Sequence, residues 1–185
     1  MERNLLVAGF GGQGVMLLGK LLSNCACENT NKNVTFFPSY GAEQRGGTAN
    51  CYVVISDDMI GAPVADVMED LIVMNEPSLN RFLGKLKPGG NLFVNSSIVH
   101  SEVGRNDIHV VKVPVTEMAL EMGNAKVLNL IMLGVYVGYT GILLPELLLE
   151  TIEKKLGKKA DLISLNKAAF RKGLDIGKAN RKKAV

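Results

Sequence analysis

The sequence predicts an α/β protein: a mostly parallel, open sheet with flanking helices, followed by a helical C-terminal third. Short apolar runs alternate with amphipathic helical stretches, a pattern typical of strand–helix–strand units. Aromatic residues make up 5% of the chain and Trp is absent, so we expect a core of Leu, Val, Ile and Met. A chain of 185 residues can build one ordinary domain, and we expect residues 1–185 to form a single domain.

The first strand–helix–strand unit lies at the start of the chain. Residues 4–9 form the expected strand, residues 12–28 the helix, and residues 34–37 a second strand that Pro38 is expected to stop. Apolar residues recur through the helix at helical spacing, namely Val15, Leu18, Leu22 and Cys25. Such a unit favours a right-handed crossover between neighbouring parallel strands, so the expected architecture is Rossmann-like.

The remaining elements follow from apolar runs, prolines and glycines. Further strands are expected at residues 49–56, 71–74, 91–95 and 108–113. Helices are expected at residues 77–86, 114–122, 125–139, 145–156 and 161–179. The most apolar stretch of the later chain, residues 127–144, contains polar side chains and glycines, which predicts a buried helix rather than a membrane span. Gly134 and Gly138 lie four positions apart and would let a neighbouring element pack closely.

The first glycine loop, residues 9–14, reads Gly-Phe-Gly-Gly-Gln-Gly and joins the first strand to the first helix. A strand, a glycine turn and a helix N-terminus together form a natural anion cradle. The spacing matches the dinucleotide fingerprint, but no carboxylate follows the second strand until Glu43, so NAD and FAD are disfavoured. The loop is not a P-loop either. The glycines could also serve only a tight turn and close helix packing.

The second glycine loop, residues 39–48, follows the second strand. The two loops are expected at the carboxyl ends of neighbouring strands, where open α/β sheets bind ligands. Arg45 could bind a phosphate or a carboxylate, or it could pair with Glu43 within the loop. Neither loop contains a nucleophile beside a base, so no catalytic residue is predicted and the isolated chain is expected to be inactive.

The cysteine content argues against a metal site, and the charge distribution bears on the class of partner. Cys25, Cys27 and Cys51 are too few for an iron–sulfur cluster, and with only two histidines a zinc site is improbable, so we expect no metal and treat the cysteines as small core hydrophobes. Residues 154–185 carry 11 Lys or Arg against 2 Asp, whereas residues 1–153 carry 10 against 16 Asp or Glu. We rank a solvated helix face first, an acidic partner second and nucleic acid last as the reason for this basic end.

The residues now point to a known family. The two glycine loops, together with residues 129–134, resemble the gamma subunit of 2-oxoacid:ferredoxin (acceptor) oxidoreductases. The similarity runs from the first strand through the helix at residues 125–140. The form of the first loop, with Val15 after it, is closest to the 2-oxoglutarate branch, although the pyruvate, branched-chain and indolepyruvate branches share the core pattern.

This resemblance implies a chemistry that the chain supports without performing it. The assembled enzyme would convert a 2-oxoacid and coenzyme A to an acyl-CoA and CO2, passing electrons to ferredoxin or a similar acceptor. Thiamine diphosphate, magnesium and iron–sulfur clusters would lie in the alpha, beta and ferredoxin-like delta subunits, and thiamine diphosphate would act as the electron sink. The resemblance and the absence of a basic-then-apolar leader imply a cytoplasmic complex without nucleic acid or membrane partners.

The candidate site consists of the glycines and polar residues of both loops, namely Gly11, Gly12, Gln13, Gly14, Glu43, Arg45, Gly46 and Gly47. We expect these residues to face the partner subunits and to shape the coenzyme A or diphosphate end of the cleft. Glycines would allow close backbone approach, Gln13 would supply an amide and Arg45 a cation. Two other possibilities stay open: a stand-alone protein that binds a nucleotide phosphate, and a purely structural assembly subunit.

Overall fold

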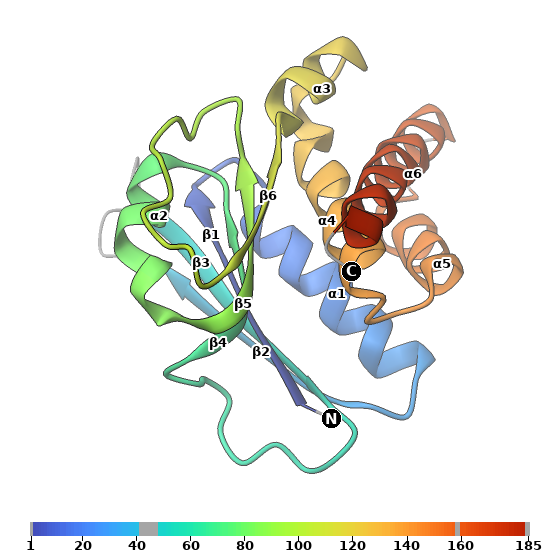
Figure 1. Ribbon diagram of the computed structural model, residues 1–185. Helices are drawn as coiled ribbons and strands as arrows, with labels where there is room; N and C mark the ends of the chain where they lie inside the picture. Colours follow the sequence, from blue (N-terminus) through green and yellow to red (C-terminus); the bar gives the residue numbers. More distant parts are fainter. Residues whose placement is uncertain (1, 41–47, 158–159, 184–185) are drawn as a thin grey trace. The chain divides into compact units, whose positions relative to one another are not determined.

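Figure 1 shows the computed structural model, which describes residues 2–40, 48–157 and 160–183. Contacts divide the chain into two units, Met1–Pro114 and Val115–Val185. The expectation of a single domain therefore stays a prediction.

The first unit is built on a six-stranded sheet with the order β2-β3-β1-β4-β5-β6. Its strands are β1 (Glu2–Phe10), β2 (Asn33–Tyr40), β3 (Thr48–Ser56), β4 (Met68–Val73), β5 (Leu86–Asn95) and β6 (His109–Val113). Strand β3 runs antiparallel to both of its neighbours, whereas the pairs β1–β4, β4–β5 and β5–β6 are parallel. The mostly parallel α/β sheet expected from the sequence is therefore confirmed.

Two expectations about β2 are wrong. First, β2 does not lie beside β1, because β3 is inserted between them and pairs with β1 from Glu2↔Ser56 to Phe10↔Thr48. Second, Pro38 does not stop the strand, which continues to Tyr40. Strand β2 is at the edge of the sheet, where the missing N–H of a proline is tolerated.

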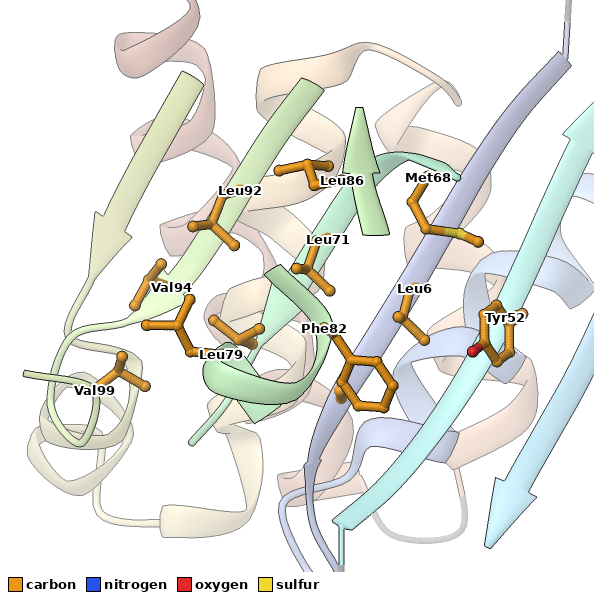
Figure 2. Packing of buried hydrophobic residues seen from close by; sticks show 12 residues of the cluster. Leu6, Tyr52, Met68, Leu71, Leu79, Phe82, Leu86, Leu92, Val94 and Val99 are labelled. Atoms are coloured by element: carbon orange, nitrogen blue, oxygen red, sulfur yellow. The ribbon is translucent and has the colours of Figure 1, made fainter. Parts of the chain in front are cut away.

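Helices cover both faces of this sheet. On one face lies α1 (Val15–Asn29), where a Cβ added to Gly19 would fall 2.5 Å from the Sγ atom of Cys51. On the other face, α2 (Glu76–Phe82) and the short 3-10 helix η1 (Leu83–Lys85) pack on a buried apolar cluster (Figure 2). Members of that cluster include Leu6, Tyr52, Leu71, Leu79, Phe82 and Leu92. Cys51 and Tyr52 are consecutive in β3, so they point to opposite faces.

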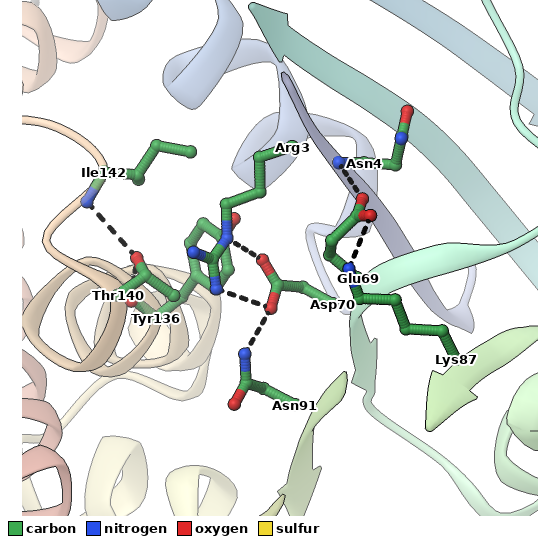
Figure 3. A network of polar contacts seen from close by, with 9 residues as sticks. All are labelled: Arg3, Asn4, Glu69, Asp70, Lys87, Asn91, Tyr136, Thr140 and Ile142. Atoms are coloured by element: carbon green, nitrogen blue, oxygen red, sulfur yellow. Dashed lines mark hydrogen bonds and ion pairs between the residues drawn. The ribbon is translucent and has the colours of Figure 1, made fainter. Parts of the chain in front are cut away.

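The amino ends of β1 and β4 are joined by partly buried ion pairs and hydrogen bonds (Figure 3). Asp70 is fully buried and accepts hydrogen bonds from the guanidinium of Arg3 and, at 2.8 Å, from the Nδ2 atom of Asn91. Glu69 accepts the backbone N–H of Asn4 at 2.7 Å and pairs with the Nζ atom of Lys87 at 2.9 Å. This network lies at the amino ends of the parallel strands, whereas the glycine loops lie at the opposite, carboxyl ends.

The cysteines of this unit only partly follow the expectation. Cys25 and Cys51 are buried, and burial raises the pKa of the Cys51 thiol to about 12. Cys27 is exposed, so its assignment to the core is wrong. The reason is the helical period, since residues two apart on α1 face different directions.

The second unit is helical. It contains α3 (Val115–Glu121), the 3-10 helix η2 (Ala125–Val127), α4 (Leu128–Thr140), α5 (Pro145–Leu156) and α6 (Ala160–Lys183). Every residue of α4 from Leu128 to Tyr139 is buried, as expected for a core helix. None of the helices in the described part of the chain is both long enough and apolar enough to cross a bilayer.

Glycines on two helices face each other in this unit. A Cβ added to Gly134 or Gly138 of α4 would lie 2.1 Å or 2.3 Å from a backbone oxygen of α6. The reverse holds for Gly173 and Gly177 of α6, at 1.9 Å and 2.2 Å from backbone oxygens of α4. The close approach predicted at Gly134 and Gly138 is thus confirmed, with a second glycine pair as its partner.

Candidate functional site

The first glycine loop follows β1 and ends at α1. Gly12 has φ 95° and Gly14, the N-cap of α1, has φ 73°, so both occupy the left-handed region that favours glycine. No side chain caps the helix at Gly14, and the carbonyl of Gly14 accepts the first helical bond, from Leu18 N–H at 2.9 Å. The backbone of this turn therefore requires glycine at two of its positions.

Gln13 fixes the loop against the next strand. Its Oε1 atom accepts the Phe10 N–H at 2.7 Å, and its Nε2 atom donates to the carbonyl of Met74 at 2.9 Å. Met74 directly follows β4, so the side chain joins the ends of two parallel strands. Gly9 makes this possible, because a Cβ there would lie 2.6 Å from Gln13 Oε1. The amide of Gln13 thus forms hydrogen bonds within the chain. That it also binds a ligand stays a prediction.

Gly11 differs from the other glycines of the loop. Its φ lies outside the left-handed region, it is exposed, and no atom of the described residues lies within 4 Å of the position that a Cβ would take. Neither the backbone conformation nor internal packing therefore requires glycine at this position. Glycine also lets another surface approach the backbone closely, so an external surface at this loop would explain Gly11.

Two asparagines extend the site to the ends of β4 and β5. Asn95 donates from Nδ2 to the same Met74 carbonyl at 3.4 Å, and Asn75 accepts the Ser78 N–H at 2.9 Å as the N-cap of α2. Both side chains are fully buried. Neither asparagine was predicted as part of the site, although an asparagine directly after a buried apolar run is a signal for such a position.

Glu76 connects α2 to the loop after β5. Its carboxylate accepts the backbone N–H groups of His100 at 3.0 Å and Ser101 at 3.2 Å. A hydrogen bond from the Ser101 side chain is the main cause of its lowered pKa, with these N–H groups adding to the effect. A carboxylate that stays ionised in this way anchors a loop and is poorly suited to act as a proton donor.

The second glycine loop begins and ends beside the first. In the sheet, Tyr40 pairs with Ala49, Ala49 pairs with Gly9, and Thr48 pairs with Phe10. The predicted residues Glu43, Arg45, Gly46 and Gly47 lie outside the described residues. Only the ends of the loop are therefore placed, and they are level with the first loop.

A cation that the sequence analysis did not name lies at this edge. Arg81 of α2 donates from Nη1 to the Oγ1 atom of Thr48 at 3.1 Å, and its guanidinium lies 5.3 Å from the ring centroid of Phe82. Among the described residues, the carboxyl ends of these strands thus combine a partly exposed glycine loop, a helix N-terminus that no side chain caps, and the exposed guanidinium of Arg81. Such an edge suits a neighbouring surface or an anionic group.

The family is established by sequence comparison. The model of the pyruvate ferredoxin/flavodoxin oxidoreductase family matches residues 4–176. The chain belongs to this family. The resemblance to gamma subunits of 2-oxoacid:ferredoxin oxidoreductases, predicted from the two glycine loops, is confirmed.

Relatives of this family differ in length. Ketoisovalerate oxidoreductase subunit VorA from Methanothermobacter marburgensis is 35% identical over 181 residues, which cover 97% of this chain and 37% of VorA. The 2-oxoglutarate synthase subunit KorC from Methanocaldococcus jannaschii is 30% identical, covering 96% of this chain and 95% of KorC. The chain therefore spans little more than a third of VorA but almost all of KorC.

A solved structure shares the fold. It is the 2-oxoglutarate:ferredoxin oxidoreductase from Magnetococcus marinus with 2-oxoglutarate, coenzyme A and succinyl-CoA bound. The sequences are 25% identical and the TM-score is 0.86, over 96% of this chain and 31% of the other. This chain is thus similar to one part of a longer polypeptide.

Proposed function

We propose that this chain is the gamma subunit of a 2-oxoglutarate:ferredoxin (or similar acceptor) oxidoreductase in the cytoplasm. The support for 2-oxoglutarate is the match to KorC along almost the full length of both chains, whereas the ketoisovalerate relative is a longer polypeptide. Other 2-oxoacids of the family are the alternatives, because groups that read the substrate would lie on other subunits. Those subunits would be alpha, beta and a ferredoxin-like delta chain.

In this proposal the chain shapes the coenzyme A end of the cleft. When bound by partner subunits, thiamine diphosphate with magnesium supplies the electron sink and iron–sulfur clusters take up the electrons. The residues of this chain hold the loop in place: Gln13 fixes it to Met74, and Gly14 begins α1 without a side-chain cap. Backbone N–H groups at such a terminus attract a phosphate. Arg81 adds a guanidinium at the same edge, and Arg45 would add another.

Gly11 is the observation that carries this proposal. The other glycines of the first loop have internal reasons, whether a left-handed φ at Gly12 and Gly14 or the close packing of Gln13 against Gly9. A Cβ at Gly11 would meet no atom of the described residues, and in this proposal the close approach of a partner subunit or of coenzyme A is the reason for this glycine.

The test uses the variant Gly11→Ala in the reconstituted complex, with Gly84→Ala as the matched control. Gly84 is also exposed, and no atom lies within 4 Å of its Cβ position. We expect Gly11→Ala to leave the melting temperature of the isolated chain unchanged while raising the KM for coenzyme A or weakening assembly. Gly84→Ala should change neither. Normal assembly and normal KM in Gly11→Ala would contradict the proposal.

Two further measurements separate the alternatives. Arg45→Ala should raise the KM for coenzyme A or weaken assembly, and unchanged values would remove its role. The stand-alone alternative is supported by the strand–loop–helix context of the first loop. It would be favoured if NAD, FAD, FMN or ATP raised the melting temperature of the isolated chain, since a ligand stabilises the state that it binds. An unchanged melting temperature with all four ligands, together with co-purification of thiamine-binding subunits, would favour the proposal that the chain is a subunit of the oxidoreductase.

A further inference from the structure

The second unit contains a pocket that the proposed function does not use. It has a volume of about 360 Å³ and lies between the last turn of α4, the connection into α5, and α6. Its walls are mainly apolar, formed by Val137, Leu143, Leu144, Pro145 and Leu174, with Gly138, Gly141, Lys178 and Arg181 completing the lining. Pockets of a few hundred Å³ with apolar walls and a few polar groups are typical of small-molecule sites.

The pocket follows from how α4 ends. At Gly138 the two helices touch, because a Cβ there would lie 2.3 Å from the Leu174 carbonyl oxygen. Three residues later α4 ends at Gly141, whose φ of 66° turns the chain away. Thr140 stabilises this end by donating to the Tyr136 carbonyl at 2.8 Å and accepting the Ile142 N–H at 3.4 Å (Figure 3). The hollow is therefore fixed by defined backbone geometry.

Two cations border the pocket on one side. Leu174, Lys178 and Arg181 recur at positions i, i+4 and i+7 of α6, so they share one helix face. Among the described residues, no acidic side chain lines the pocket. Within the described part of the chain, neither cation makes an ion pair or hydrogen bond. Asp175 on α6 and Glu146 on α5 directly follow lining residues in the sequence, but neither of them lines the pocket.

Only one of these two cations, Arg181, has an interaction within the chain that explains its position. The Nη1 atom of Arg181 lies 2.8 Å from the Cβ position of Gly141, at the C-terminus of α4, where the partial negative charge of a helix attracts a cation. Lys178 has no such partner in the part of the chain that the structure describes. An unpaired ammonium beside a guanidinium, at the mouth of an apolar pocket, indicates a ligand that is anionic at one end and apolar at the other.

We propose that this pocket binds a small amphiphilic carboxylate, meaning one carboxylate on a short apolar chain or ring. The apolar part lies between Val137, Leu143 and Leu174, and the carboxylate lies between Lys178 and Arg181. Leu144, which is 65% exposed, forms the rim over which the ligand enters. This proposal is independent of the function proposed for the glycine loops.

The probe is octanoate, added to the full chain carrying ¹³C-labelled Leu and Val methyl groups. We expect saturable shifts at Val137, Leu143 and Leu144, and none at Leu71, which is buried in the first unit. Octan-1-ol and octylammonium have the same tail, and they should bind at least about fivefold more weakly, the size of one partly exposed ion pair. Absence of shifts, or equal binding of all three probes, would overturn the proposal.

Variants locate the head group. Lys178→Ala and Arg181→Ala should each weaken octanoate binding about fivefold. Lys172→Ala is the matched control, because Lys172 lies on the same helix, is exposed, and sits 3.6 Å from Glu121 instead of at the pocket. A loss of affinity in the control equal to that in the two pocket variants would show general charge attraction and refute the site.

A second pair of variants avoids the risk that a cation supports the fold. Leu144 is exposed, so Leu144→Asp and Leu144→Asn should both fold. Leu144→Asp places a carboxylate at the rim, where it competes for Lys178 and Arg181, whereas Leu144→Asn has the same shape without the charge. We expect octanoate affinity to fall several-fold more in Leu144→Asp than in Leu144→Asn. Equal affinities in both variants would contradict recognition of the head group by these cations.

Discussion

Alanine at Gly134 should destabilise the protein, although alanine is the better helix former. The added Cβ would lie 2.1 Å from the Phe170 carbonyl oxygen and 2.7 Å from the Leu174 backbone nitrogen. An ordinary contact is at least 3.4 Å, so α4 and α6 must separate by about 1 Å. Backbone atoms cannot rotate away as a flexible side chain can, and the whole helix pair must move.

The magnitude follows from two opposing effects. Alanine in a helix interior gains about 1 kcal/mol over glycine. Overpacking of a core costs about 1–3 kcal/mol or more, and a clash with backbone belongs at the upper end. A gap of about 1 Å also weakens dispersion along the rest of the helix contact, including the second glycine of α4, Gly138. We expect a net loss of about 2 kcal/mol or more in the free energy of unfolding, lowering the melting temperature by about 4–8 °C.

Urea unfolding and calorimetry of the full chain measure this effect. Gly84→Ala serves as the control, since Gly84 has open space around its Cβ position and should not be destabilised. Gly173→Ala should be at least as harmful, because its Cβ would lie 1.9 Å from the Ile131 carbonyl oxygen. If Gly134→Ala were as stable as the wild type, or gained the stability of a better helix former, the close packing of α4 and α6 would be refuted.

Three further predictions concern the first unit. Exposed Cys27 should react with a thiol reagent at pH 8, whereas Cys51, buried and with a pKa of about 12, should react only after unfolding; fast modification of Cys51 in the folded chain would contradict its burial. The pKa of Glu69 is lowered: desolvation by burial raises it, but hydrogen bonds from Lys87 and the Asn4 N–H together outweigh that effect. A lowered carboxyl pKa contributes stability at pH values above the unfolded pKa of 4.5, and this stability is lost as the pH falls through the folded pKa. Lys87→Met should therefore lower the free energy of unfolding, measured with urea, at pH 7 and have little effect on it at pH 3. An equal loss at both pH values would exclude the ion pair as its cause. Gln13→Leu removes two hydrogen bonds and leaves the Phe10 N–H without its acceptor, so it should cost about 1–3 kcal/mol, and faster amide exchange of Phe10 should report the loosened loop.

The sequence by itself determined the local elements and the family. Residues 145–156 were expected to be helical, and α5 has these bounds, because Pro145 suits the first turn and Gly157 follows the end. Glycines in the first loop predicted the turn between β1 and α1, and their spacing, together with the second loop, identified the family. These features depend on neighbouring residues, so a single sequence encodes them.

Tertiary structure alone decided which distant segments meet. Strand β3 lies between β1 and β2, and Gly134 of α4 packs against the backbone of α6 beside Gly173. The side chain of Gln13 donates a hydrogen bond to the carbonyl of Met74, which is 61 positions away. No local propensity specifies such partners, because they are chosen by burying apolar faces and pairing backbone groups across long loops.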